Sequence, residues 1–147
     1  MIVKRIFNKK ECLSILSDPQ IFQEITEDGG KLENILIDVA NHFWLGIYDH
    51  GELCGVVFIK PAYSQCYEIH IQILKQHRKK AKKAGLNVLE WCSKNIPSKT
   101  LMTNIPVFCK NVRFYVLSLG FKNSGLLPRS WKKNSKIHDM NIFTKVL

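Results

Sequence analysis

The sequence predicts an α/β domain of the α+β type, in which one mixed sheet carries helices on its faces. Three observations favour this class. Strand-like and helix-like segments alternate along the chain, residues 67–74 alternate polar and apolar side chains, and residues 79–94 carry an apolar stripe at helical spacing. No repeat, linker or low-complexity stretch interrupts the 147 residues, so we expect a single domain over 1–147.

The N-terminal segment is expected to form a strand followed by two short helices. Residues 2–7 are rich in β-branched side chains, and Asn8 is a candidate N-cap for a helix that runs to about Ser17. After an Asp-Pro step, residues 20–26 favour a second helix, which the two glycines of 27–30 end in a turn.

An antiparallel hairpin comes next. The apolar runs 42–48 and 52–59 flank Asp49-His50-Gly51, which is typical of a tight hairpin turn, and Pro61 is expected to end the second arm. Residues 67–74 are the clearest strand. Its isoleucines share one face, and the polar residues Glu68, His70 and Gln72 share the other.

The remaining elements are a helix, a strand, a second helix and two strands. The helix over 79–94 is followed by a strand over 99–105 and a helix over 111–119 that Gly120 ends. A strand that starts at Phe121 is expected to enter a long basic loop, and 137–146 completes a final hairpin.

Composition favours an ordinary globular protein. The chain is 46% hydrophobic, 23% charged and 10% aromatic, which excludes intrinsic disorder. Its five cysteines are an odd number without Cys-x-x-Cys spacing, so we expect reduced, mostly buried thiols and no metal site. No apolar run is long enough to cross a bilayer and no signal peptide is apparent, so a cytoplasmic protein without a membrane partner is expected.

Positive charge is the main clue to a ligand. A formal charge of +10 favours an anionic ligand, an acidic partner or nucleic acid. The cations gather in two clusters: Lys75, Arg78, Lys79, Lys80, Lys82 and Lys83, and then Arg129, Lys132, Lys133 and Lys136. The first cluster opens a helix, where the helix dipole already disfavours cations, so an anion such as a pyrophosphate would compensate it. A merely solvated cationic face is the alternative.

These residues resemble the GNAT N-acetyltransferases, whose pyrophosphate loop reads Arg/Gln-x-x-Gly-x-Gly/Ala after the fourth strand. Arg78 matches the start of that loop, Ala81 stands at the first glycine, and Lys83 or Ala84 at the second. The stretch resembles most a phage and bacterial subgroup, through His70-Ile71, Arg78 to Gly85 and Leu89-Glu90-Trp91. Residues 111–121 resemble the helix and Gly-Phe that follow the fifth strand.

The resemblance implies a mostly antiparallel sheet of about seven strands flanked by about four helices. It also implies that acetyl-CoA, the acetyl donor, lies in a split between the fourth and fifth strands. The backbone near Ile71, Gln72, Ile73 and Leu74 would meet its pantetheine and acetyl groups. The pyrophosphate would lie against Arg78, Lys79, Lys80, Ala81, Lys82, Lys83 and Ala84. Asn111 would bind pantetheine, two residues after the family's position, and Tyr115 would be the general acid, one residue before it.

Acetyl transfer also needs a base that deprotonates the amine, and His70 and Glu68 are the candidates because they share the polar face of 67–74. A hydrogen-bonded structural histidine and an exposed carboxylate are the alternative interpretations. The family implies direct transfer without a covalent enzyme intermediate. The acceptor is an amine that the sequence does not identify: a protein, an aminoacyl compound or a small amine.

Two other functions fit the sequence. The first is a nucleic-acid-binding protein, which would use both basic clusters, with Trp131 stacking on a base. Its partner would be nucleic acid or an acidic or nucleic-acid-associated protein. A catalytically inactive GNAT-like binding or inhibitory module would account for the degenerate motif. A homodimer is left open.

Overall fold

The computed structural model describes all 147 residues. Its elements follow the predicted order. They are β1 (Ile2–Arg5), α1 (Lys9–Leu16), α2 (Pro19–Ile25), the 3-10 turn η1 (Leu32–Asn34), β2 (Phe43–Asp49), β3 (Glu52–Tyr63), β4 (Cys66–Ile73), the 3-10 turn η2 (Lys75–Lys80), α3 (Ala81–Asn95), β5 (Thr100–Pro106), α4 (Lys110–Ser118), β6 (Lys122–Lys133) and β7 (Lys136–Val146).

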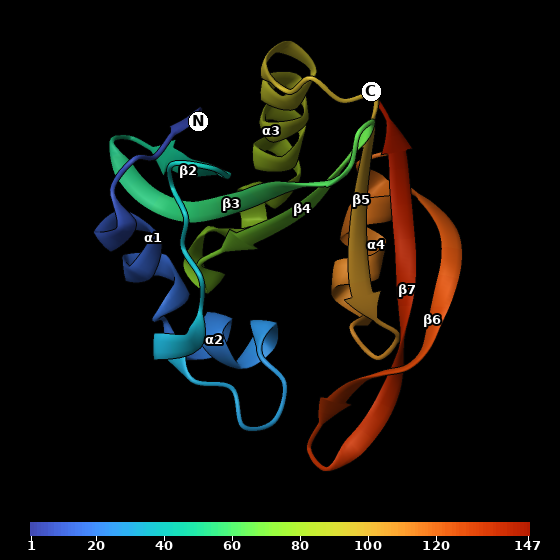
Figure 1. Ribbon diagram of the computed structural model, residues 1–147. Coiled ribbons are helices and arrows are strands. Elements are labelled where there is room, and N and C mark those ends of the chain that lie inside the picture. Colours follow the sequence, from blue (N-terminus) through green and yellow to red (C-terminus); the bar gives the residue numbers. More distant parts are fainter.

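All seven strands form one sheet in the order β1-β2-β3-β4-β5-β7-β6 (Figure 1). Every pairing is antiparallel except that between β4 and β5. These two parallel strands pair only over Cys66–Glu68 and Thr100–Met102, and then diverge. We call the opening that follows the split; it divides β1–β4 from β5–β7.

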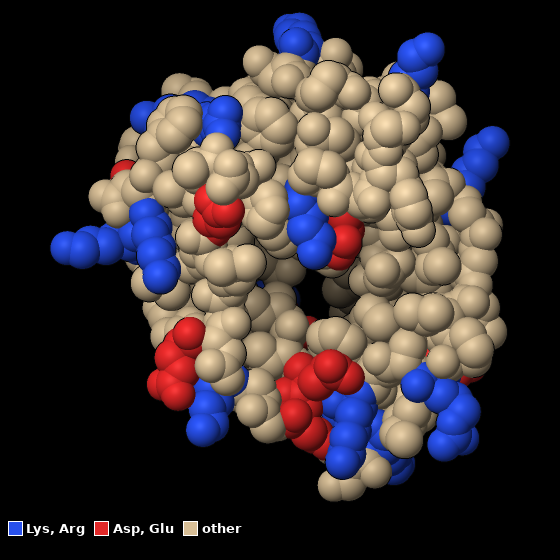
Figure 2. All heavy atoms as spheres, viewed as in Figure 1, with Lys and Arg blue, Asp and Glu red and all other residues tan.

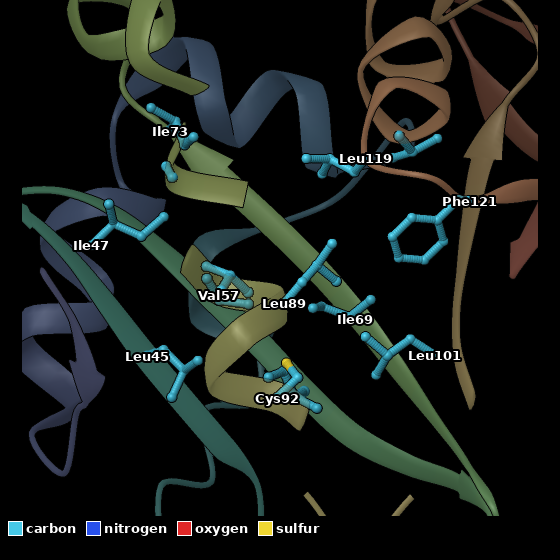
Figure 3. Packing of buried hydrophobic residues seen from close by; sticks show 14 of the residues in the cluster. Leu45, Ile47, Val57, Ile69, Ile73, Leu89, Cys92, Leu101, Leu119 and Phe121 are labelled. Atoms are coloured by element: carbon cyan, nitrogen blue, oxygen red, sulfur yellow. The ribbon is translucent and has the colours of Figure 1, made fainter. Parts of the chain in front are cut away.

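Helices cover both faces of the sheet. Helices α1 and α2 pack with Trp44 and Val56 in one buried cluster, and we call this side the α1–α2 face. Helix α3 packs against Ile69 and Ile73 on the other side, the α3 face. Figure 3 shows Leu119 and Phe121, from beyond the split, in the same cluster as Leu89 and Ile69 of α3 and β4. The core on the α3 face therefore joins the two halves of the sheet.

Side-chain caps fix the starts of the two N-terminal helices, at the predicted Asn8 and at Asp18, which was not predicted as a cap. Asn8 accepts a hydrogen bond from the Lys10 amide at 2.8 Å and caps α1, and Asp18 caps α2 by accepting from the next two amides at 3.1 Å. In the β2–β3 hairpin His50 and Gly51 have φ values of 50° and 80°, as a two-residue type I′ turn requires.

Strand β3 does not end at Pro61 as predicted, and continues to Tyr63. The pairing with β4 explains why. The Leu74 amide donates to the Cys54 carbonyl, so even-numbered residues of β3 bond to β4 and Pro61 faces the β2 side. Strand β2 pairs with β3 only as far as Ile59, so the missing N–H of proline costs no ladder bond.

The expected long basic loop after Phe121 is instead a strand. Strand β6 is an edge strand that runs to Lys133, with register shifts after Asn123 and Leu127. Its polar side chains stay in water, so no burial penalty opposes pairing. Arg129, with φ of 49°, lies in the second irregularity and donates its amide to Asp139 at 2.8 Å.

The helix expected from Lys79 begins two residues later, at Ala81, because the basic residues before it form the 3-10 turn η2. All five cysteines are free thiols, three of them buried. No helix combines the length and apolar character that crossing a membrane would need.

Candidate active site

The split exposes the edge of β4 beyond its short pairing with β5. Because the Leu74 amide donates to Cys54 at 2.9 Å, the alternation of the ladder turns Gln72 toward β3 as well. The backbone groups of Ile71 and Ile73 therefore point into the split, and the Ile73 carbonyl accepts the Nε of Arg78 at 3.0 Å. Of the four predicted backbone positions, Ile71 and Ile73 are therefore the two whose amides meet no neighbouring strand.

The two candidate bases are in contact on the α1–α2 face. The Nε2 of His70 lies 2.6 Å from Oε1 of Glu68, a hydrogen-bond distance. The ring of His70 stacks on Phe58, which stacks in turn on Trp44. With Nε2 held by the carboxylate, Nδ1 is the nitrogen of His70 left to accept a proton. This is the arrangement of a base oriented by a second group.

The carboxyl group of Glu68 is kept ionised by its neighbours. The hydrogen bond from His70 lowers its pKa below the ordinary 4.5, against the opposing effect of burial, and the charges of His70 and Lys60 lower it further. The Nζ of Lys60 is 3.8 Å from Oε2 of Glu68. Glu68 is therefore an anion at neutral pH, and in this form it orients the His70 ring.

The cationic stretch 78–83 contains two kinds of residue. All of these cations were expected beside a pyrophosphate, but Arg78 forms a two-pronged ion pair with Glu24 of α2, at 3.2 and 2.8 Å. Lys80 contacts Asp49 at 2.6 Å. Both carboxylates lie far away in the sequence, and both satisfy these cations inside the fold.

The free cations of this stretch are Lys79, Lys82 and Lys83, which are exposed and form no ion pair. They surround the start of α3, which no side chain caps. The Ala81 amide donates to the Arg78 carbonyl, and Ala84 is buried against the core. An anion at this helix start would meet lysine ammonium groups and the positive end of the helix dipole.

Tyr115 is engaged in the structure rather than free to donate a proton. Its hydroxyl donates to the Ala81 carbonyl at 2.7 Å, and burial raises its pKa to about 12. A Cβ on Gly85 would come within 2.5 Å of this oxygen, so the hydroxyl and α3 are in close contact. This position favours a role in holding α4 against α3 over the expected role as general acid.

Asn111 is exposed in the first turn of α4 and forms no side-chain hydrogen bond, so its amide is free for a ligand. Cys109 is the N-cap residue of the same helix but makes no capping bond. Burial and the charge of Glu24 raise the pKa of its thiol, which therefore stays protonated at neutral pH.

The tip of the β6–β7 hairpin reaches across to the loop after α2. Asp28 accepts the Asn134 and Ser135 amides at 2.9 and 2.8 Å, and the Lys132 amide donates to Glu27 at 2.8 Å. Figure 2 shows a hollow between these two sides of the molecule. The hairpin and α2 therefore enclose one end of the split on the α1–α2 face.

One lysine of the second basic cluster is engaged inside the fold, while Arg129, Lys132 and Lys136 are exposed. The ammonium group of Lys133 donates to the Gln23 and Thr26 carbonyls at the end of α2. Trp131 lines a pocket of about 410 Å³ with the loop 25–35. On the face in Figure 2, blue and red side chains are interspersed, which disfavours the nucleic-acid interpretation for that face.

Three residues near the site escaped the sequence analysis. Glu24 has no local pattern that marks it as the partner of Arg78. Lys60 lies one residue beyond the predicted arm 52–59, and the register of β3 with β4 places it opposite Glu68. Asn104 of β5 has a buried Oδ1 without a hydrogen-bond partner. Alternation from Met102, which pairs with Glu68, places Asn104 on the α1–α2 face.

Solved structures share this architecture. The chain is similar to ribosomal-protein-alanine N-acetyltransferase from Brucella melitensis, with 14% identity, 100% of both chains covered and a TM-score of 0.74. It is similar to a mutant of spermidine N-acetyltransferase SpeG from Vibrio cholerae, with 12% identity, 99% of this chain and 95% of that chain covered, and a TM-score of 0.79. Microcin C7 self immunity acetyltransferase MccE, in complex with acetyl-CoA and AMP, covers 73% of this chain and 62% of its own, at 20% identity and a TM-score of 0.63.

These likenesses, together with the seven-stranded sheet and its split, confirm the predicted GNAT fold. By sequence, the chain belongs to the family described as "Protein of unknown function (DUF2824)", whose model matches residues 3–145. No curated protein matches the sequence.

Proposed function

We propose that this chain is an acetyl-CoA-dependent N-acetyltransferase that moves the acetyl group directly to an amine. The observation that carries the proposal is the split, which has an oriented His70–Glu68 pair on the α1–α2 face and an uncapped, cationic helix start at one end. A base and an anion site on either side of an exposed strand edge are the parts that acetyl transfer from a phosphorylated donor needs.

The residues around the split fit acetyl-CoA. The ammonium groups of Lys79, Lys82 and Lys83 have no partner in the fold and would meet the pyrophosphate beside the N-terminus of α3. The inward-facing amide of Ile71 and the free side chain of Asn111 would hold the pantetheine arm by hydrogen bonds. When bound, the donor supplies an activated thioester carbonyl.

In the proposed reaction His70 takes a proton from the attacking amine at Nδ1, while Glu68 holds Nε2 and stabilises the resulting imidazolium. The amine nitrogen forms a bond to the acetyl carbon as the carbon–sulfur bond breaks, and the thiolate leaves. Phe58 stacks on the imidazole and fixes its plane, and Trp44 stacks in turn on Phe58. No covalent enzyme intermediate is needed, in keeping with the protonated state of Cys109.

A second candidate is a GNAT-like binding module without transfer. The specific observation that favours it is the engagement of Arg78 and Tyr115 within the fold, since both were expected to serve the donor. One experiment separates the two. The purified protein is incubated with acetyl-CoA and a mixture of amines, and free thiol is measured. Amine-dependent thiol release supports the transferase, whereas donor binding without release supports the module.

A further inference from the structure

The carboxylates that border the split on the α1–α2 face already have partners. Glu24 holds Arg78, Asp28 accepts two hairpin amides, and Glu27 accepts one. Glu68 is shared by His70 and Lys60. Each of these carboxylates therefore already holds a group of the fold, and the second positive charge of a polycationic acceptor such as a polyamine would have to compete with that group.

A cation is available instead, directly beside the proposed base. At 3.8 Å from Glu68 Oε2, the Nζ of Lys60 forms an ion pair but no hydrogen bond, so its three N–H donors remain available to a ligand. Its side chain is 41% exposed, and its ammonium group lies 5.9 Å from the centre of the Phe58 ring. Lys60 and His70 therefore contact the same carboxylate from opposite oxygens.

An unpaired acceptor lies on the same face of the sheet, on the strand beyond the split. Oδ1 of Asn104 is buried and accepts no hydrogen bond, and its residue lies on the same sheet face as Glu68. Leaving a buried oxygen without a partner is unfavourable, and an N–H of a ligand would relieve that cost. Polar groups of three kinds thus lie on this face: a proton acceptor, a cation and a carbonyl oxygen.

We propose that the acceptor is an α-amino carboxylate, an amine whose neighbouring carbon carries a carboxylate. The carboxylate binds the ammonium group of Lys60, the amine lies at His70, and Asn104 Oδ1 receives an N–H of the amine. The inference rests on the proposed transferase function and gives its substrate class. The amine nitrogen becomes the amide nitrogen of the product, its lost proton goes to His70 Nδ1, and the thiolate that leaves takes a proton from water.

The test compares matched acceptors at fixed acetyl-CoA. The twenty natural amino acids, each beside its primary carboxamide, and spermidine are assayed by thiol release. For the best amino acid, kcat/KM should exceed that of its carboxamide and of spermidine by about tenfold or more, the usual value of a charge-assisted contact. The carboxamide replaces the α-carboxylate by the amide of a peptide N-terminus, and spermidine represents the polyamines.

Variants of Lys60 test whether this residue binds the α-carboxylate of the acceptor. Lys60→Met keeps the apolar stem over Phe58 and should reduce the preference for acid over carboxamide about tenfold. Lys60→Arg should keep the preference, and Lys122→Met, an exposed lysine on β6, should not change it. Thermal unfolding shows that each variant is folded.

Equal rates with acid and carboxamide would overturn the inference in favour of a peptide N-terminus, and faster transfer to spermidine would overturn it in favour of a polyamine. Absence of transfer to every amino acid, in protein that binds acetyl-CoA, would overturn it too. If acetyl-CoA itself fails to bind, the proposed function fails first and the inference falls with it.

Discussion

The polar face of β4 and the cationic stretch 78–83 differ in where their partners come from. On β4, His70 contacts a residue two positions away, on the same side of the same strand. In the cationic stretch, Arg78 and Lys80 contact carboxylates 54 and 31 positions away. Period-two alternation makes the first contact readable in the sequence, whereas the second exists only once α2 and the β2–β3 turn are placed.

The largest expected effect concerns the polar face of β4. Replacing His70 by Gln keeps a polar side chain but removes the titrating nitrogen, so kcat should fall by about 10²–10⁴-fold. Acetyl-CoA affinity, measured by calorimetry, should change little. Asn104→Ala serves as a control variant, because it changes a polar residue on the same sheet face and leaves the proposed base in place.

A structural role for His70 would give a different result. If His70→Gln lowers the melting temperature steeply along with the rate, the histidine acts mainly through its contacts with Glu68 and Phe58. If the rate and its pH profile both survive, His70 is not the base.

The next effect tests the division within the cationic stretch. Lys82→Ala with Lys83→Ala removes two free cations and should weaken acetyl-CoA binding about tenfold, or about 1.4 kcal/mol. The free energy of unfolding should stay the same or rise slightly, because cations are unfavourable at a helix start.

Arg78→Ala is the contrasting change, since it breaks the ion pair with Glu24. It should lower the free energy of unfolding by up to about 1 kcal/mol, as expected for a partly exposed two-pronged pair, and Glu24→Gln should reproduce most of that loss. Urea titration measures both. A variant that keeps full stability but no longer binds acetyl-CoA would show that Arg78 serves the donor after all.

A smaller effect is expected at Tyr115. Tyr115→Phe removes the hydrogen bond to Ala81 and should cost about 1 kcal/mol of stability. The transfer rate should stay within about threefold, since the phenol is not placed as a general acid, whose loss would cost about a hundredfold or more. Steady-state kinetics beside thermal unfolding separates these outcomes.

The smallest effect is the pH dependence of the Glu68 contacts. The pKa of the Glu68 carboxyl group is lowered in the folded state. The stabilisation that its contacts provide is therefore complete above the ordinary pKa of about 4.5, and it is lost as pH falls through the lowered pKa of the folded protein. The difference in unfolding free energy between the protein and Glu68→Gln should therefore be constant from about pH 7 to 5 and shrink below about pH 4. A difference that grows in acid would contradict the assignment.

Much of the fold was readable because its signals are local. Asn8 as a cap, the turn at His50-Gly51 and the alternation of 67–74 each depend on neighbouring residues, and the structure contains all of them. The extension of β3 through Pro61 was not readable, because it depends on how far β2 reaches beside it. The long strand β6 was hidden for a related reason, since an edge strand in water needs no apolar pattern.

The candidate site was predicted in part. The shared face of Glu68 and His70 follows from strand geometry, and the structure adds their contact. Lys60 and Asn104 escaped notice because register with the neighbouring strands, rather than any motif, brings them to the site. The hydrogen bonds between Asp28 and the tip of the β6–β7 hairpin join segments more than 100 residues apart, so no local sequence pattern predicts them.

The central claim is that the split binds acetyl-CoA, and titration calorimetry at moderate salt tests it most directly. The account predicts a micromolar dissociation constant that weakens with salt, and thermal stabilisation in parallel. With a dissociation constant of about 10 μM, 1 mM acetyl-CoA should stabilise the fold by about 2.7 kcal/mol. No heat and no stabilisation at 1 mM acetyl-CoA would contradict the account.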